Sequence, residues 1–262
     1  MQEQRDRAER ALAAATATAD GLVFDLSQDF RDAVGVSKDF IRAILGRALD
    51  LQRALATSGE NAPSLKRSEA VAQGEISVAL LEQGDIAGAL AAAKRSNVIH
   101  QDLAAAAPDD GSRKSDLATS YVHIADVQIS AGLHTDADLA LAKARGIAED
   151  LVAANPDDPG ARRDLLLSIQ RIGDLRLKSG SSDEALRLFR ECLATSLELV
   201  KRYPKNVRLQ RDLAVLHRRV GGALKAVGKF KEALSSYGEG IEAAKRLAAA
   251  DDLNSQFQHD LA

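Results

Sequence analysis

The sequence predicts an all-α protein built from stacked antiparallel helix pairs. Three markers recur at intervals of 48 residues: an aspartate before a leucine, a glycine and a proline. They are Asp116, Asp164, Asp212 and Asp260; Gly84, Gly132, Gly180 and Gly228; and Pro108, Pro156 and Pro204. A fixed period of this length indicates a repeat array, in which each unit buries its apolar face against its neighbours. Composition agrees, because the 262 residues are rich in Ala and Leu and contain no Trp.

The period divides the chain into consecutive segments. Residues 1–19 are expected to form a helix that either connects to an upstream element or caps the first repeat. Residues 20–63 resemble a degenerate helix pair. Four better copies follow at 64–111, 112–159, 160–207 and 208–255. Residues 256–262 match the opening of another first helix, which favours either a short cap or a segment cut from a longer repeat protein.

Helix boundaries are most explicit in the third copy. Asp158 is expected to cap the first helix, with Pro159 in its first turn. Gly180 should end that helix in the left-handed conformation, and Ser181 with Glu184 reads as a capping box for the second helix. The corresponding signals are Gly84 and Asp85 in the first copy, Gly132 and Thr135 in the second, and Gly228 in the fourth.

Small residues recur at positions that should face one another within each pair. Five residues after each glycine stand Ala89, Ala137, Ala185 and Ala233. Seven residues before each glycine stand Ser77, Ala125, Gly173 and Gly221, and twelve after it stand Ser96, Ala144, Cys192 and Gly240. Small side chains at facing positions let two antiparallel helices approach closely, so this pattern predicts tightly packed pairs.

This spacing resembles the tetratricopeptide repeat (TPR). The best copy runs Gly221, Gly228, Ala233, Tyr237 and Gly240. The resemblance implies a right-handed superhelical solenoid of antiparallel helix pairs. Two features depart from it: the unit has 48 residues where the family has about 34, and the large aromatic residue early in the first helix is present only as Tyr121. The long unit is similar to arrays at the C-terminal end of bacterial signalling and defence proteins.

In that family the first helices line a concave groove that binds partners. Carried over by position, the groove residues would be His123, Asp126, Gln170, Asp174, Lys178, Arg218, Gly222 and Lys225. A polar groove of this kind suits a protein or an extended or helical peptide. The resemblance therefore implies a non-catalytic interaction or scaffolding module. The alternative is a regulatory array that senses a ligand or peptide and changes its curvature on binding.

Charge is unevenly distributed although the formal net charge is only −3. Residues 201–231 contain ten basic residues and one acid, whereas residues 105–160 contain ten acids and four basic residues. Three interpretations remain open: solvated helix faces, a basic patch for an acidic partner, and head-to-tail self-association. Nucleic acid is disfavoured because the basic stretch has only Tyr203 and Phe230 for stacking.

The periodic aspartates have two structural interpretations. Each could place a negative charge in the first turn of a first helix, where it interacts favourably with the helix dipole. Each could instead pair with an Arg of a neighbouring repeat.

Nothing in the sequence indicates catalysis, a cofactor or a metal. The five histidines lack partners at metal-ligand spacing, so they are expected to be scattered over the surface or the groove. Cys192 stands at a small-residue position and is expected to be a buried, inert thiol. There is no phosphate-binding loop, no secretory signal and no apolar run long enough to span a membrane. A cytoplasmic location is expected.

Overall fold

Eight helices account for the regular structure of residues 63–250, the part of the chain that the computed structural model describes together with residues 43 and 46. No strand occurs in this part. The helices are α3 (Pro63–Glu82), α4 (Ile86–Ala106), α5 (Gly111–Ser130), α6 (His134–Ala154), α7 (Pro159–Lys178), α8 (Ser182–Arg202), α9 (Val207–Ala226) and α10 (Phe230–Ala250). The expected N-terminal helix (1–19), almost all of the degenerate pair (20–63) and the final segment (256–262) lie outside the described residues.

The chain divides into two units, residues 1–127 and 128–262. In unit 1, α3 packs against α4. The hydroxyl of Ser77 donates to the carbonyl of Ala89 at 2.8 Å, and that of Ser96 donates to Ala70 at 2.7 Å. Two buried serines therefore tie α3 to α4 through backbone carbonyls, which satisfies hydroxyls that burial would otherwise penalise.

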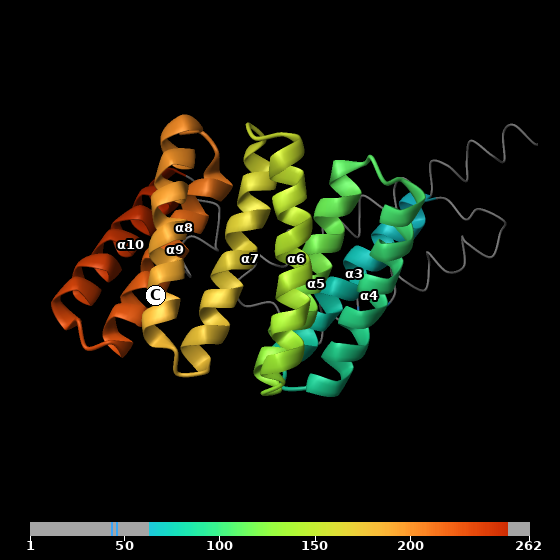
Figure 1. Cartoon of the computed structure of the whole chain (residues 1–262), viewed down its shortest axis with the longest axis horizontal. Helices are drawn as coiled ribbons and strands as arrows, with labels where there is room; N and C mark the ends of the chain where they lie inside the picture. The colour runs from blue at the N-terminus through green and yellow to red at the C-terminus, as the bar shows by residue number, and fades with distance from the viewer. Residues whose placement is uncertain (1–42, 44–45, 47–62, 251–262) are drawn as a thin grey trace, which may run out of the picture. The chain divides into compact units, whose positions relative to one another are not determined.

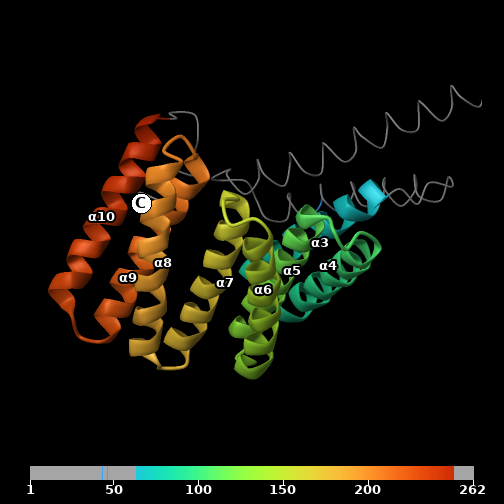
Figure 2. The same ribbon diagram turned by 45° about the horizontal axis from the view of Figure 1, so that its top comes forward.

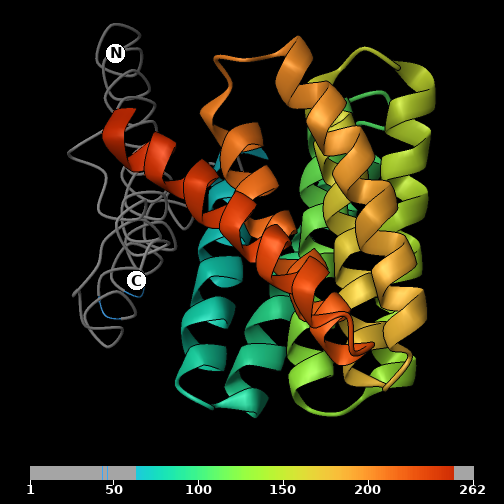
Figure 3. The same cartoon turned by 90° about the vertical axis from the view of Figure 1, so that its left-hand side faces the viewer.

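In unit 2, consecutive helices from α6 to α10 pack against each other, and α7 also contacts α9. Figure 1 and Figure 2 show α7 to α10 running in alternate directions, so α7 and α9 are parallel. Figure 3 views the molecule with α10, in red, in front of the other helices of unit 2. The first helices of the last two pairs are therefore neighbours in space.

Glycine ends the first helix of each described pair in a left-handed conformation. The four glycines have φ of +81° at Gly84, +73° at Gly132, +83° at Gly180 and +78° at Gly228. An L-residue with a side chain adopts this conformation only at a cost, whereas glycine does so freely. Each turn therefore reverses the chain within a few residues, which brings the second helix back along the first.

The helix caps agree with the sequence in part. Asp85 accepts a hydrogen bond from the backbone N–H of Gly88, and Asp158 accepts one from Gly160 with Pro159 in the first turn. The prediction of a capping box at Ser181 and Glu184 was wrong, because the Ser181 side chain makes no cap hydrogen bond. Glu184 instead accepts from Nε of Arg176 at 3.2 Å. A salt bridge to the preceding helix thus replaces the local bond to the backbone.

The predicted cap at Thr135 was also wrong. Helix α6 begins one residue earlier, at His134, and Leu133 occupies the N-cap position. The side chain of Leu133 makes no cap hydrogen bond at this helix start. An apolar residue therefore stands where a polar cap would satisfy the first backbone N–H groups.

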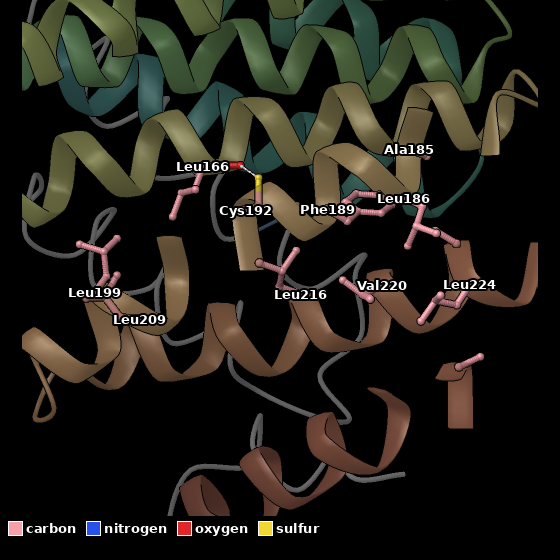
Figure 4. Packing of buried hydrophobic residues seen from close by; sticks show 12 residues of the cluster. Leu166, Ala185, Leu186, Phe189, Cys192, Leu199, Leu209, Leu216, Val220 and Leu224 are labelled. Carbon is pink, nitrogen blue, oxygen red and sulfur yellow. Dashed lines mark hydrogen bonds between the residues drawn. The ribbon is translucent and has the colours of Figure 1, made fainter. Parts of the chain in front are cut away.

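The core of unit 2 lies between α7, α8, α9 and α10 (Figure 4). It contains Leu166, Ala185, Leu186, Phe189, Cys192, Leu199, Leu209, Leu216, Val220, Ala223, Leu224 and Ala233. Ala185 and Phe189 are fully buried. A Cβ added to Gly173 would lie 2.5 Å from Cε1 of Phe189, and one added to Gly221 would lie 2.7 Å from Cε1 of Tyr237. The glycine of the first helix therefore makes room for the ring of the second.

The first-helix residue at this position is larger than glycine in the pairs whose second helix has no aromatic ring opposite it. Sixteen residues after each small residue of the first helix stand Ala93, Leu141, Phe189 and Tyr237. The first-helix partners are Ser77, Ala125, Gly173 and Gly221. Glycine thus occurs in the two pairs in which the second helix supplies an aromatic ring, and Ser or Ala occurs in the other two. Close packing of interiors explains this exchange of volume between the two helices.

Candidate interaction surface

Two of the periodic aspartates, Asp116 and Asp212, form salt bridges between successive first helices. Nε of Arg67 on α3 donates to Oδ2 of Asp116 on α5 at 2.6 Å, and its Nη2 donates to Oδ1 at 3.2 Å. Arg163 on α7 binds both carboxylate oxygens of Asp212 on α9 in the same way. Each pair is separated by 49 residues. The alternative of a charge in the first helical turn was wrong, since no acid stands in the first turn of α5, α7 or α9.

The predicted groove residues are divided between the two units. His123 and Asp126 belong to α5 in unit 1, and the remaining residues belong to unit 2. Within unit 2 the predicted residues share helix faces at spacings of three and four. We call this surface the α7–α9 face; it consists of Gln170, Asp174 and Lys178 on α7 and Arg218, Gly222 and Lys225 on α9.

Arg219 connects the two halves of the α7–α9 face. Its Nε lies 3.0 Å from Oδ1 and 3.1 Å from Oδ2 of Asp174, and its Nη1 lies 3.3 Å from Oε1 of Gln170. Nη1 of Arg171 also donates to Asp174 at 3.3 Å. The acceptors of Asp174 and Gln170 are therefore engaged within the fold. Arg219 was not among the predicted groove residues, although Arg171 stands 48 residues before it at the same repeat position.

The cationic members of this face are exposed. Lys178, Arg218 and Lys225 all lie at the surface, and no residue of the described part of the chain forms an ion pair with them. Lys178 and Lys225 stand in the last turns of α7 and α9, where a positive charge interacts favourably with the helix dipole. The face therefore presents three positive charges to solvent, while its single carboxylate is neutralised internally.

His123 packs inside unit 1. A Cβ added to Gly74 on α3 would lie 3.1 Å from Nδ1 of His123 and 3.6 Å from Oγ of Ser96. The imidazole therefore lies over a glycine of the preceding first helix, and it is half-buried. This contact gives His123 a role in packing α5 against α3.

Two histidines are in the core, which corrects the expectation that all five lie on the surface or in the groove. His100 is 4 % exposed and His217 is 7 % exposed. Burial lowers the pKa of both imidazoles below the ordinary value of 6.5. Glu239 opposes this effect at His217, because one of its carboxylate oxygens lies 3.0 Å from Nδ1. Both rings are therefore held mainly in the neutral form at neutral pH.

Cys192 lies in the core of unit 2, as its small-residue position predicts. Burial raises the pKa of its thiol to about 12, and Sγ lies 3.8 Å from the carbonyl oxygen of Leu166 (Figure 4). The thiol therefore remains protonated, whereas a nucleophilic cysteine needs thiolate character and access to solvent. Within residues 63–250, no three His, Cys, Asp or Glu side chains gather closely enough to hold a metal ion.

The helices of the described residues do not meet the requirements of a membrane span. None of the helices in residues 63–250 combines the length and the apolar character needed to cross a bilayer.

Comparison with known proteins supports the fold through structure and not through sequence. No family model matches the chain, and no curated protein matches it. The crystal structure of BtubC from P. vanneervenii is similar with a TM-score of 0.58 and 15 % identity, over 96 % of this chain and 92 % of that one. The crystal structure of a Podosopora anserina kinesin light chain with nearly identical TPR-like repeats gives a TM-score of 0.51 and 16 % identity, over 90 % and 96 %. The expected TPR-like, all-α solenoid fold is thus confirmed.

Proposed function

We propose that this TPR-like chain is a non-catalytic docking module, whose α7–α9 face in unit 2 binds a segment of another protein. The observation that carries the proposal is the arrangement around Arg219. This side chain fixes α9 against α7 through Asp174 and Gln170, while Arg218 and Lys225 remain in solvent beside it. A binding surface needs rigid placement of its contact groups and groups left free for a ligand, and this face supplies both.

The repeat architecture supports the same function. Stacked helix pairs form extended surfaces from the first helices of successive units, and such surfaces are suited to peptides. The two parallel first helices α7 and α9 are joined near their starts by Arg163 and Asp212 and further along by Arg219 and Asp174. A ligand on this face would therefore meet side chains from both helices at fixed spacing.

The test is charge reversal with a matched control. Arg218→Glu with Lys225→Glu changes the face, and Arg187→Glu with Lys201→Glu makes the same change in net charge on exposed positions of α8. Proteins captured by the whole chain from the lysate of its own organism would be identified, purified and titrated against each form. We expect the first double variant to lose affinity for at least one partner and the control to retain it. Equal affinity of the two variants for every purified partner would refute the proposal.

The wider setting is also part of this proposal. The 48-residue unit and the recurrent Arg-Asp-Leu at Arg163 and Arg211 support a place within a larger bacterial signalling or defence protein of the cytoplasm. The division into repeats at 64–111, 112–159, 160–207 and 208–255 remains part of the same hypothesis. Sequencing the reading frame on both sides of this chain would test its place within a larger protein, since an adjoining effector domain is expected.

A further inference from the structure

We propose that the ligand of the α7–α9 face is an acidic peptide segment, bound by Lys178, Arg218 and Lys225. This inference rests on the proposed docking function and specifies the chemistry of the partner. It follows from which polar groups on the face are already paired and which are left exposed.

The acceptors of the face are occupied within the fold. Both oxygens of Asp174 lie within 3.1 Å of Nε of Arg219, and the side-chain oxygen of Gln170 also faces this guanidinium. Gln170 is only 4 % exposed. A ligand that offered positive charge would have to displace Arg219, which is half-buried. The face is therefore poorly suited to a basic partner.

The donors of the face are exposed in contrast. Arg218 and Lys225 are seven residues apart on α9, which corresponds to about 10 Å along the helix axis. Lys178 lies near the same end of the face as Lys225, because α7 and α9 are parallel and Asp174 lies level with Arg219. Arg218 and Lys225 thus lie on one side of α9, where their mutual repulsion favours a partner that brings negative charge.

The spacing indicates the form of peptide that fits. A peptide in the polyproline II conformation advances about 9 Å in three residues and returns the same side chain to the same face. Acids at every third position would therefore meet Arg218 and Lys225 in turn. Guanidinium and ammonium groups bind carboxylates with charge-assisted hydrogen bonds, which are stronger than neutral ones.

Single-stranded nucleic acid would present a different requirement. Non-specific binding of single strands combines basic side chains with aromatic rings on which bases stack. The six residues of the α7–α9 face include no aromatic residue. The ring of Tyr237 lies beside the face, but its atoms pack against Gly221 and its hydroxyl lies 3.8 Å from a Cβ added to Gly222. We therefore assign the face to peptide carboxylates.

The experiment measures binding of a fluorescein-labelled dodecapeptide with Glu at every third position to the whole chain. A second peptide carries Gln at the same positions, and a single-stranded oligonucleotide of about the same length serves as a polyanion of another class. We expect saturable binding of the Glu peptide that weakens as salt rises, and at least tenfold weaker binding of the Gln peptide. Arg218→Glu with Lys225→Glu should lower affinity for the Glu peptide at least tenfold, whereas Arg187→Glu with Lys201→Glu should lower it less than threefold.

Five results would overturn the inference. Equal loss in both double variants would show general attraction to net charge, and equal binding of the Gln peptide would show that carboxylates are not read. Tighter binding of the oligonucleotide with loss in the same variant would assign the face to nucleic acid. If the Glu peptide does not bind while binding of a captured protein still depends on Arg218 and Lys225, the docking function is retained and the acidic-peptide proposal is rejected. If neither the peptide nor any captured protein depends on these two residues for binding, both proposals are rejected. Thermal melts confirm that each variant is folded.

Discussion

Arg163 of α7 and Asp212 of α9 face one another with two hydrogen bonds, although 49 residues separate them in the sequence. Arg67 and Asp116 form the same bidentate pair between α3 and α5. In unit 2 a second bridge runs in the opposite sense, since Arg219 of α9 donates to Asp174 of α7. The two bridges therefore connect α7 and α9 at two levels, with the arginine on a different helix in each.

A double-mutant cycle should detect coupling between Arg163 and Asp212. The side chains are 30 % and 22 % exposed, so solvent weakens the interaction, and we expect a coupling free energy of about 0.5–1 kcal/mol. The measurement is the free energy of unfolding in urea for Arg163→Ala, Asp212→Ala and the double variant. Arg187 and Glu191, a more exposed pair within α8, provide the control and should couple more weakly. Additive effects at Arg163 and Asp212 would show that the bridge adds no stability.

Adjacent glycines in α9 should respond in opposite ways to alanine. Gly221→Ala would place a methyl group 2.7 Å from the Tyr237 ring and should cost about 1–3 kcal/mol through overpacking. Gly222→Ala meets only the Tyr237 hydroxyl at 3.8 Å and should stabilise the helix by about 0.5–1 kcal/mol. Chemical denaturation of both variants makes the comparison. Adding Tyr237→Leu to Gly221→Ala should recover part of the loss, since Ala125 and Leu141 form that combination in the second copy.

Enlarging the buried alanine of α8 should destabilise unit 2. Ala185 has no exposed surface and lies in the core cluster, so Ala185→Leu should cost about 1–3 kcal/mol. Ala194→Leu places the same side chain at an exposed position of the same helix and should be nearly neutral. Thermal melts of the two variants give the answer. A neutral Ala185→Leu would mean that the two helices are not in close contact there.

Stability should fall as the pH drops below about 6.5, the ordinary pKa of histidine. His100 and His217 have lowered pKa values in the folded chain, because burial disfavours their charged forms. Below the ordinary pKa the unfolded chain therefore binds more protons than the folded chain, so the free energy of unfolding decreases toward acid. Urea denaturation at about one pH unit on either side of that value measures the change. His217→Gln should reduce this loss, and an unchanged pH dependence in that variant would exclude His217 as a contributor.

The sequence predicted the helix pairs because their signals are local and periodic. Glycine at position 180 is explained by its own backbone conformation alone, and alanine at position 185 is explained by the close approach of the neighbouring helix. Side chains that reach between repeats were harder to predict. Arg219 forms a salt bridge with Asp174, which is 45 residues away in the sequence. Glu184 binds Arg176 and does not cap the start of its own helix. These contacts depend on how far long side chains extend across a helix interface, which no spacing in the sequence specifies.

The buried histidines show a different limit. His217 occupies the position that the TPR pattern assigns to a large aromatic residue, so its burial could have been inferred from the repeat. His100 stands at a position that holds the small residues Ala148, Ser196 and Ala244 in later copies, so the pattern gives no sign of an imidazole ring there. For the candidate face, the sequence supplied Lys178, Arg218 and Lys225, and the structure added the pairing that neutralises Asp174.

The pairing of Gly173 with Phe189 and of Gly221 with Tyr237 has a consequence for how such an array can be recombined. A second helix that carries a ring can be grafted only beside a first helix that carries glycine, because Ser or Ala at that place would collide with the ring. Whole helix pairs remain interchangeable, whereas single helices are interchangeable only between pairs that share the combination of glycine and ring. Duplication and shuffling of this chain should therefore proceed mainly in steps of two helices, because a first helix with Ala125 joined to a second helix with Phe189 would have a mismatched interior.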